Sequence, residues 1–411
     1  TGRLVIIPLL NSVSATPGTF TTTDLAANLA NIILISAGDI RITTNGVDYN
    51  LKNLNFTKCV TWADVATVLN NSFVAGTVSA ITNGFVVTSK KVGSASTVSL
   101  GAVAGGTGTA LNGAGYFNAS SGSSVAGANS SGETILQAIA RTSGAVGYVP
   151  FMTTLDLEDA AILDASNGVQ ALDNLYFQHV ASVEDIAGIG TTIQQAGNKK
   201  TRILLYTNSM ADANLMKAAY AGRGCSVNFT GSFTSSTMNL KQLVTIDPDN
   251  GITQTLYVQA NTAGVDIYVS MDGVPSVISS YGNDFFDNPY SDLALKFALE
   301  AAGFNFLRQT NTKVPQTEPG MNGLKSAYAQ VCIQFVRNGC VAPGQWNSSE
   351  TFGDPQIFQN NVLANGYYIY SLPVALQNST DRDARIAPLV QIAIKRAGAI
   401  QHSDAIVLVN N

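Results

Sequence analysis

Few residues in this chain of 411 have side chains in a spacing that could perform chemistry. The sequence contains two histidines, His179 and His402, and no Gly-x-Ser-x-Gly motif. A catalytic triad with a serine or cysteine nucleophile is therefore not predicted. His179 follows an apolar run, where we expect a satisfied, partly buried imidazole. His402 precedes the last apolar segment, where we expect a turn residue that fixes the entry of a strand.

Three carboxylates, Asp156, Glu158 and Asp159, lie close enough in sequence to form an acid–base cluster. Thr153 precedes Asp156 by three residues, which resembles a capping box, and acidic residues in a first turn complement the helix dipole. This pattern favours a structural role. The segment from Asp247 to Gly251 has the oxygen ligands of a calcium loop but lacks the closing glutamate, so it predicts a turn.

Glycine and cysteine patterns do not predict a cofactor site. Gly188-Ile-Gly190 lacks the third glycine of a dinucleotide motif, and Gly105-Gly-Thr-Gly108 lacks the lysine that would bind phosphate. The cysteines have neither a disulfide framework nor a zinc spacing, and we expect free thiols at Cys59, Cys225, Cys332 and Cys340. The sequence therefore predicts no cofactor, no metal and no enzyme.

The composition bounds the possible partners. Hydrophobic residues make up 45% and charged residues 12%, with a formal net charge of −5 and no basic cluster, which disfavours nucleic-acid binding. No apolar run approaches the ~20 residues of a membrane-spanning helix. A weakly charged surface is poorly protected against association, which favours a protein covered by other subunits. A secreted or thermally robust monomer could share this composition.

The length predicts two or three domains, and the pattern indicates an α/β and α+β multidomain chain. Residues 1–16 read as an N-terminal strand segment. Residues 17–100 read as a small α+β hairpin-rich insertion domain, with Asn45-Gly46 and Asn83-Gly84 predicting type I′ turns around a helix at 61–71. Residues 101–132 are rich in Gly, Ala, Ser and Asn and predict a linker.

Residues 133–280 predict a middle domain of the βαβ type, because strand patterns alternate with helical patterns. The predicted strands are 148–152, 175–178, 202–206, 255–259 and 265–269, and the predicted helices are 156–165, 183–195 and 210–221. A mostly parallel sheet follows from this alternation.

Residues 281–411 predict an α+β C-terminal domain. Helices are expected from Ser291 to Gly303 and from Glu318 to Asn338. A charged segment follows at Asp381, Arg382, Asp383 and Arg385. After Pro388 an apolar-striped helix closed by Gly398 is expected, and its stripe is Leu389, Val390, Ala393 and Ala397.

The chain closes with an apolar run from Ala405 to Val409, which is typical of a strand buried on both faces. Such a strand needs a sheet to join. Its partner is either an earlier strand of the same chain or the sheet edge of another chain. The pattern alone favours pairing within the same chain, because short terminal strands usually pair at home.

Several segments, in this order, resemble the C-terminal signature of contractile tail sheath proteins of myophages, in the branch long filed as a phage domain of unknown function. They are Asn338-Gly-Cys-Val-Ala-Pro-Gly344, Asn365-Gly-Tyr-Tyr-Ile369, Asp381-Arg-Asp-Ala-Arg-Ile-Ala-Pro388 and Lys395-Arg-Ala-Gly-Ala-Ile400 with His402. Gly132-Glu-Thr-Ile135 matches the start of the middle domain of that branch. The resemblance spans about residues 130 to 411.

The resemblance implies a non-enzymatic machine part of the virion tail, assembled in the host cytoplasm. It implies six-fold rings stacked helically around a tail tube protein, bounded by baseplate and tail terminator proteins, that contract to drive the tube through the host envelope for genome ejection. Asp381 to Arg385 would be the arm hinge, and the exchanged, subunit-linking strand would be Ile406, Val407, Leu408 and Val409. A tail tube or baseplate component is the alternative function, and an α/β enzyme is the third.

Overall fold

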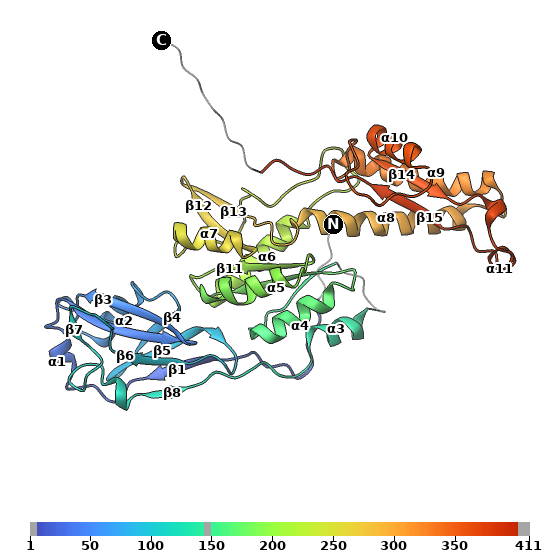
Figure 1. The fold of residues 1–411 in the computed structure, drawn as a ribbon. Coiled ribbons are helices and arrows are strands. Elements are labelled where there is room, and N and C mark those ends of the chain that lie inside the picture. Colours follow the sequence, from blue (N-terminus) through green and yellow to red (C-terminus); the bar gives the residue numbers. More distant parts are fainter. Residues whose placement is uncertain (1–5, 144–148, 402–411) are drawn as a thin grey trace, which may run out of the picture. The chain divides into compact units, whose positions relative to one another are not determined.

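The computed structural model describes residues 6–143 and 149–401, and the chain divides into two compact units. The first comprises Thr1–Arg223 with Leu240–Phe285, and the second comprises Gly224–Asn239 with Phe286–Asn411. Figure 1 colours most of the first unit from blue to yellow, and the long segment of the second in orange and red. Both units combine helices with strands, which confirms the mixed multidomain class.

Two small sheets form a hairpin-rich domain at the start of the first unit. One has the order β4-β5-β1-β8, and the other has the order β3-β2-β6 with β7 paired to β2. The elements are β1 (Pro17–Thr21), α1 (Leu29–Ile32), β2 (Gly38–Thr44), β3 (Val47–Leu54), α2 (Trp62–Asn70), β4 (Gly76–Ile81), β5 (Gly84–Val92), β6 (Val98–Gly101), β7 (Thr109–Ala110), η1 (Ala119–Ser121) and β8 (Ser123–Val125).

Local sequence signals explain the hairpins and the helix of this domain. Asn45 and Gly46 have φ angles of +54° and +82°, so the first turn is type I′ as predicted. The type I′ turn predicted at Asn83-Gly84 is wrong. Ile81 pairs with Gly84, so the loop is Thr82-Asn83, and neither of these residues has a positive φ. Helix α2 begins at a capping box in which the Thr61 hydroxyl accepts from the Asp64 amide.

The segment expected as a linker at 101–132 forms part of the hairpin-rich domain. It contributes β7, η1 and β8, and its Leu111 and Phe117 side chains are fully buried in the domain core. Phe117 packs edge-on against Phe85, with ring centroids 4.9 Å apart. Two buried apolar residues anchor a segment whose average composition is that of a linker, and this is why composition alone was misleading.

The described part of the predicted N-terminal strand segment lies beside the chain that leaves the hairpin-rich domain. Val13 forms an isolated antiparallel bridge with Ser131, and Thr16 forms one with Ala128. The two crossings of the chain are thus held side by side. We name these paired segments, residues 13–16 and 128–131, the neck.

An α/β domain completes the first unit. Its sheet has the order β13-β12-β11-β10-β9, in which β9 to β12 are parallel and β13 is antiparallel. Every residue of β10 and β11 is buried, as expected for strands covered on both faces. The elements are α3 (Ile135–Thr142), β9 (Pro150–Met152), α4 (Asp159–Val169), β10 (Leu175–Val180), η2 (Ile186–Gly190), α5 (Thr191–Gln195), β11 (Thr201–Leu205), α6 (Met210–Gly224), α7 (Gln254–Thr262), β12 (Val265–Met271) and β13 (Val274–Ile278).

The strand predicted at 255–259 is instead part of helix α7. The Thr253 side chain caps this helix by accepting from the Leu256 amide. Leu256, Tyr257 and Ala260 pack against the core of the domain, and their i, i+1, i+4 spacing is helical. The β-branched and aromatic content of this short run misled the strand prediction, since packing overrode propensity.

The second unit is built on two long helices, α8 (Asp287–Gln309) and α9 (Glu318–Asn338). Helix α9 ends where predicted, at Gly339, which has φ +95°. The remaining elements are α10 (Pro355–Asn365), β14 (Tyr367–Ser371), η3 (Val374–Leu376), α11 (Ser379–Asp383) and β15 (Val390–Ile394). Figure 1 shows β14 and β15 side by side next to these helices.

The helix predicted after Pro388 is wrong, because Val390–Ile394 forms strand β15. It pairs antiparallel with β14, with Ile369 opposite Ile392. Val390, Ile392 and Ile394 alternate with Gln391 and Ala393, a period of two that a sheet partner can use. The residues of the expected helical stripe therefore do not share one helical face.

Candidate assembly site

The candidate functional site is the chain directly after β15, residues 395–398, which we name the arm root. It lies between β15 and the predicted C-terminal arm. Its floor is a small apolar cluster in which Leu295 of α8 and Phe335 of α9 are buried with Val341. Ile394, the last residue of β15, packs on this cluster. Burial of these side chains fixes the end of the strand to the two helices.

Main-chain hydrogen bonds continue beyond β15 and hold the root. The Ala342 amide donates to the Lys395 carbonyl at 3.0 Å, and the Ala397 amide donates to the Cys340 carbonyl at 2.9 Å. Val341 and Arg396 form an isolated antiparallel bridge between them. The segment after α9 is thus paired with the chain that follows β15 through this single bridge.

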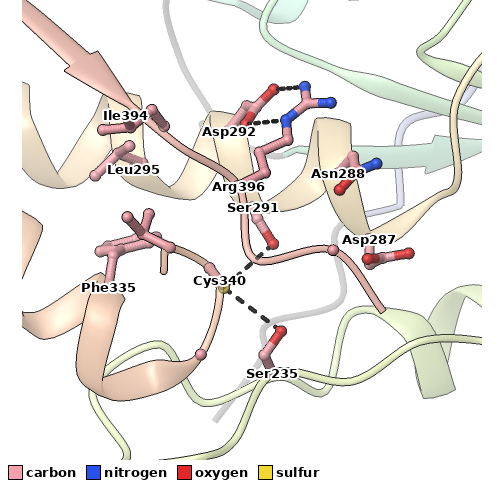
Figure 2. Close-up of a pocket in the computed structure, with 13 residues that line it drawn as sticks. Ser235, Asp287, Asn288, Ser291, Asp292, Leu295, Phe335, Cys340, Ile394 and Arg396 are labelled. Carbon is pink, nitrogen blue, oxygen red and sulfur yellow. Dashed lines mark hydrogen bonds and ion pairs between the residues drawn. The ribbon is translucent and has the colours of Figure 1, made fainter. Parts of the chain in front are cut away.

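An ion pair between Arg396 and Asp292 joins the arm root to helix α8. The Arg396 guanidinium binds the Asp292 carboxylate through two nitrogens, and its Nε lies 3.3 Å from Oδ1. Figure 2 shows this pair beside the pocket at the root. Both side chains are about two-fifths exposed, at 42% and 41%, so the pair is worth on the order of 0.2–1 kcal/mol and its main effect is geometric.

One face of α8 supplies the polar wall of this pocket. Asp287, Ser291 and Leu295 recur every four residues and therefore project from the same side of the helix. The Cys340 thiol lies 3.4 Å from the Ser291 hydroxyl (Figure 2). It also lies 2.7 Å from Oδ1 of Asn338. The contacts of the Cys340 thiol are weak polar contacts.

Comparison with protein families indicates what the second unit resembles. Residues 286–409 match the family model described as E217 tail sheath protein gp31-like, C-terminal domain. This part of the chain is similar to a phage tail sheath domain. The match begins at Phe286, the residue at which the long segment of the second compact unit also begins. No curated protein matches the chain.

The family match confirms the resemblance to phage tail sheath proteins, over less than a third of the 411 residues. It supports a structural role in the virion tail, with self-association and contact with a tail tube as the general properties of such proteins. In the described part of the chain, no helix is both long and apolar enough to cross a bilayer. The absence of catalysis stays a prediction.

The predicted hinge of the tail sheath domain lies on an exposed turn between β14 and β15. Asp381, Arg382 and Asp383 belong to helix α11, and Arg385 follows with φ +57°. The Arg382 guanidinium donates to the Val374 carbonyl, and the Asn378 side chain caps the helix. Within the described residues the four side chains form no ion pair with one another.

The predicted linking strand, Ile406 to Val409, and His402 lie outside the described residues. The pairing of Arg396 with Asp292 was not predicted, because residues 388–398 were expected to form a helix. The alternation of Val390, Ile392 and Ile394 was the signal for a strand. A strand predicted at 390–394 would have placed Arg396 just after its end.

The residues considered for acid–base chemistry have separate structural partners in the first unit. Asp156 lies 3.3 Å from His179 Nε2, the Glu158 carboxylate accepts from the Ser130 amide at 2.9 Å, and Asp159 binds a lysine. Helix α4 begins at Asp159 with Glu158 at its N-cap, so the predicted Thr153 capping box is wrong. Asp156 and Asp159 line the same pocket as His179, and each carboxylate there has its own partner.

His179 is buried, as predicted, and has two partners. Its Nδ1 lies 2.9 Å from the Lys217 ammonium, which also donates to the Thr153 carbonyl. Burial lowers the pKa of His179, against the raising effect of Asp156. Burial also lowers the pKa of Lys217 to about 7. The neutral imidazole accepts from Lys217 and donates to Asp156, which satisfies all three groups.

The cysteines are free thiols in the described structure, as predicted. Burial raises the pKa of Cys225 and of Cys332 to about 12 in each case, so neither is a nucleophile at neutral pH. No group of three or more His, Cys, Asp or Glu side chains in the described ranges has a geometry that could hold a metal ion.

Proposed function

We propose that this chain is a structural subunit of a phage contractile tail sheath. It polymerises as stacked hexameric rings around the tail tube and contracts to drive the tube through the host envelope. The tail tube, the baseplate and the tail terminator are its partners, and assembly takes place in the host cytoplasm. The family match supports the sheath, and the proposed lattice and contraction follow from the function of such a sheath.

The observation that carries the proposal is the sheet beside the arm root. In the described part of the chain, β14 and β15 form a sheet of two strands, and nearly all of their residues are only half-buried. Two-stranded sheets are marginal alone, and their edges accept further strands. The apolar run from Ala405 to Val409 follows the root by only a few residues in sequence.

We propose that this run leaves its own subunit and joins the β14–β15 sheet of a neighbour. Four apolar side chains, Ile406 to Val409, would each contribute about 1.5–3 kcal/mol on burial, and each ladder hydrogen bond about 1 kcal/mol net. A link of this size persists while weaker polar contacts between subunits break and re-form. Contacts that repeat by a rotation that does not close generate a helical array.

Two segments are proposed to let the arm move. Asp381 to Arg385 lie on the turn that connects β14 to β15, so displacement of β15 along β14 bends this turn. Gly398, with φ +72°, has no neighbour within 4 Å of the position a Cβ would take, and it follows the last hydrogen bond between two main-chain groups of the root. Beyond it, the Gln401 carbonyl accepts from the Asn239 side chain at 3.5 Å. The tail can therefore change direction there while Arg396 stays on α8.

Truncation of residues 405–411 tests this function. The truncated chain is expected to keep the circular dichroism spectrum and melting temperature of the full chain but to remain monomeric in sedimentation velocity. The full chain is expected to form tubes or stacked rings in negative-stain images.

A matched control keeps the chain length and replaces Ile406 and Leu408 with serine. It should also fail to polymerise, because the apolar contact is lost while the main chain remains. Normal assembly of the truncated chain would refute the linking role of this segment. Assembly into a closed species of fixed size would refute the sheath.

A further inference from the structure

Two adjacent carboxylates of the α/β domain, Glu184 and Asp185, contact the hairpin-rich domain through different partners. They lie in the loop after β10, where the Glu184 amide donates to the Ser182 hydroxyl at 3.3 Å and the Asp185 amide donates to the Ser182 carbonyl at 3.1 Å. These bonds hold the loop in one conformation. The two side chains then bind donors from two different sheets of the hairpin-rich domain.

Glu184 receives three donors from the β2–β3 hairpin. The Thr44 hydroxyl lies 2.7 Å from Oε1, the Tyr49 hydroxyl lies 3.1 Å from the same oxygen, and the Asn45 amide donates to Oε2. Burial, together with the Glu184 charge, raises the pKa of Tyr49, so its hydroxyl stays protonated as a donor. A carboxylate with three donors is bound far more firmly than in a single surface pair.

Asn45 is itself fixed by the hairpin-rich domain. Its carbonyl oxygen accepts from the Thr97 amide at 3.1 Å, and its amide lies 3.3 Å from the Ser89 hydroxyl. The residue that supplies a positive φ to the type I′ turn is therefore also a rigid donor to Glu184. The turn cannot move without breaking these bonds.

Asp185 binds Lys91, which lies near the end of β5 in the other sheet. The Lys91 ammonium lies 3.2 Å from Asp185 and 2.7 Å from Asp159 of α4. Asp185 is buried, and the Lys91 side chain is 19% exposed. Next to it, the Lys90 ammonium donates to the Thr207 carbonyl at 2.6 Å, just after β11. Both lysines thus reach the same end of the parallel sheet.

We infer that Glu184 and Asp185, with their partners Thr44, Tyr49 and Lys91, clamp the hairpin-rich domain onto the α/β domain so that the two move as one body. The neck alone, two chain crossings joined at Val13 and Thr16, is a single connection about which a domain can swing. The clamp adds contacts from both sheets away from the neck. In the proposed sheath, the hairpin-rich domain would then follow every displacement of the α/β domain.

The experiment measures the distance distribution between spin labels at positions 58 and 164 in the full chain. Lys58 is exposed on the hairpin-rich domain, and Asp164 is exposed on α4. The labels are attached to unnatural side chains so that the native cysteines stay intact. The unaltered chain is expected to give one narrow distribution.

The double variant Glu184→Ala with Lys91→Met is expected to widen the distribution at least two-fold. Lys199→Met, which removes an exposed lysine of the α/β domain, is the matched control and should leave it narrow. A double variant that keeps the narrow distribution would overturn the clamp.

A milder variant keeps the inference testable if the double variant fails to fold. Thr44→Val with Tyr49→Phe removes two donors and leaves Lys91 in place. Hydrogen exchange at the neck amides, residues 13–16 and 128–131, is expected to become at least ten-fold faster, with the exchange of β10 and β11 unchanged. Equal exchange at the neck would overturn the inference as well.

Discussion

At the scale of single residues, the ionisable groups of the first unit serve packing and connection. Lys217 is 1% exposed and has the His179 imidazole and a main-chain carbonyl as its partners. A sequence reader sees a lysine on a helix and expects a solvated ammonium. The contact depends on a strand, a helix and a loop that are distant in sequence, and no local pattern contains it.

Burial of Lys217 makes the free energy of unfolding depend on pH. Its pKa is lowered from 10.5 to about 7 by burial, so the folded chain loses this proton at a lower pH than the unfolded chain. Unfolding then takes up a proton between pH 7 and 10.5, and the free energy of unfolding rises across that window. From pH 7.5 to 9 we expect a gain of about 1.5–2 kcal/mol.

Urea unfolding of the full chain and of Lys217→Met at both pH values measures this gain. The variant should lack the rise, while the other titrating groups contribute to both proteins equally. The same rise in both proteins would show that Lys217 is not buried in the folded chain as a poorly solvated amine.

At the scale of elements, the sequence predicted those with strong local signals. The type I′ turn at Asn45-Gly46, the capped helix α2, the parallel strands β10 and β11, and the end of α9 at Gly339 were all recognisable. Predictions failed where a segment becomes a helix or a strand according to the part of the chain that packs against it. Residues 390–394 are short enough to be helix or strand, and only β14, reached through a turn, settles the choice.

Two glycines at the ends of helices in the second unit provide a matched pair for a stability test. Gly339 has φ +95°, and a Cβ there would meet only the Ser235 side chain at 3.8 Å. Gly366 has φ +81°, and a Cβ there would meet the Ala342 carbonyl carbon at 2.7 Å and the Pro343 nitrogen at 2.9 Å. An alanine at either position would be strained by the positive φ. At Gly366 its Cβ would also clash with the main chain of Ala342 and Pro343.

Gly339→Ala is expected to cost about 1–2 kcal/mol, from the positive φ alone. Gly366→Ala is expected to cost clearly more, because residues 342–343 must move and they pair with the chain after β15. Thermal unfolding of the two variants in the same buffer measures the difference. Equal losses would mean that the segment after α9 does not lie against Gly366.

At the scale of the whole molecule, the low charge of the chain bears on how copies associate. Only 12% of the residues are charged, and the proposed link is made of apolar side chains and main-chain hydrogen bonds. Salt screens exposed charges but leaves such contacts nearly unaffected. We expect the assembled fraction, measured by sedimentation, to change less than two-fold between 50 mM and 500 mM salt. Dissociation at high salt would point to an interface of ion pairs.

The proposed function depends most on where the terminal apolar segment lies once subunits assemble. An electron cryo-microscopy map of the assembled chain, at a resolution that traces strands, tests this directly. We predict that the β14–β15 sheet gains a further strand made of residues 405–409 from a neighbouring subunit. A sheet that keeps two strands in the assembly, or takes this segment from its own chain, would contradict the account.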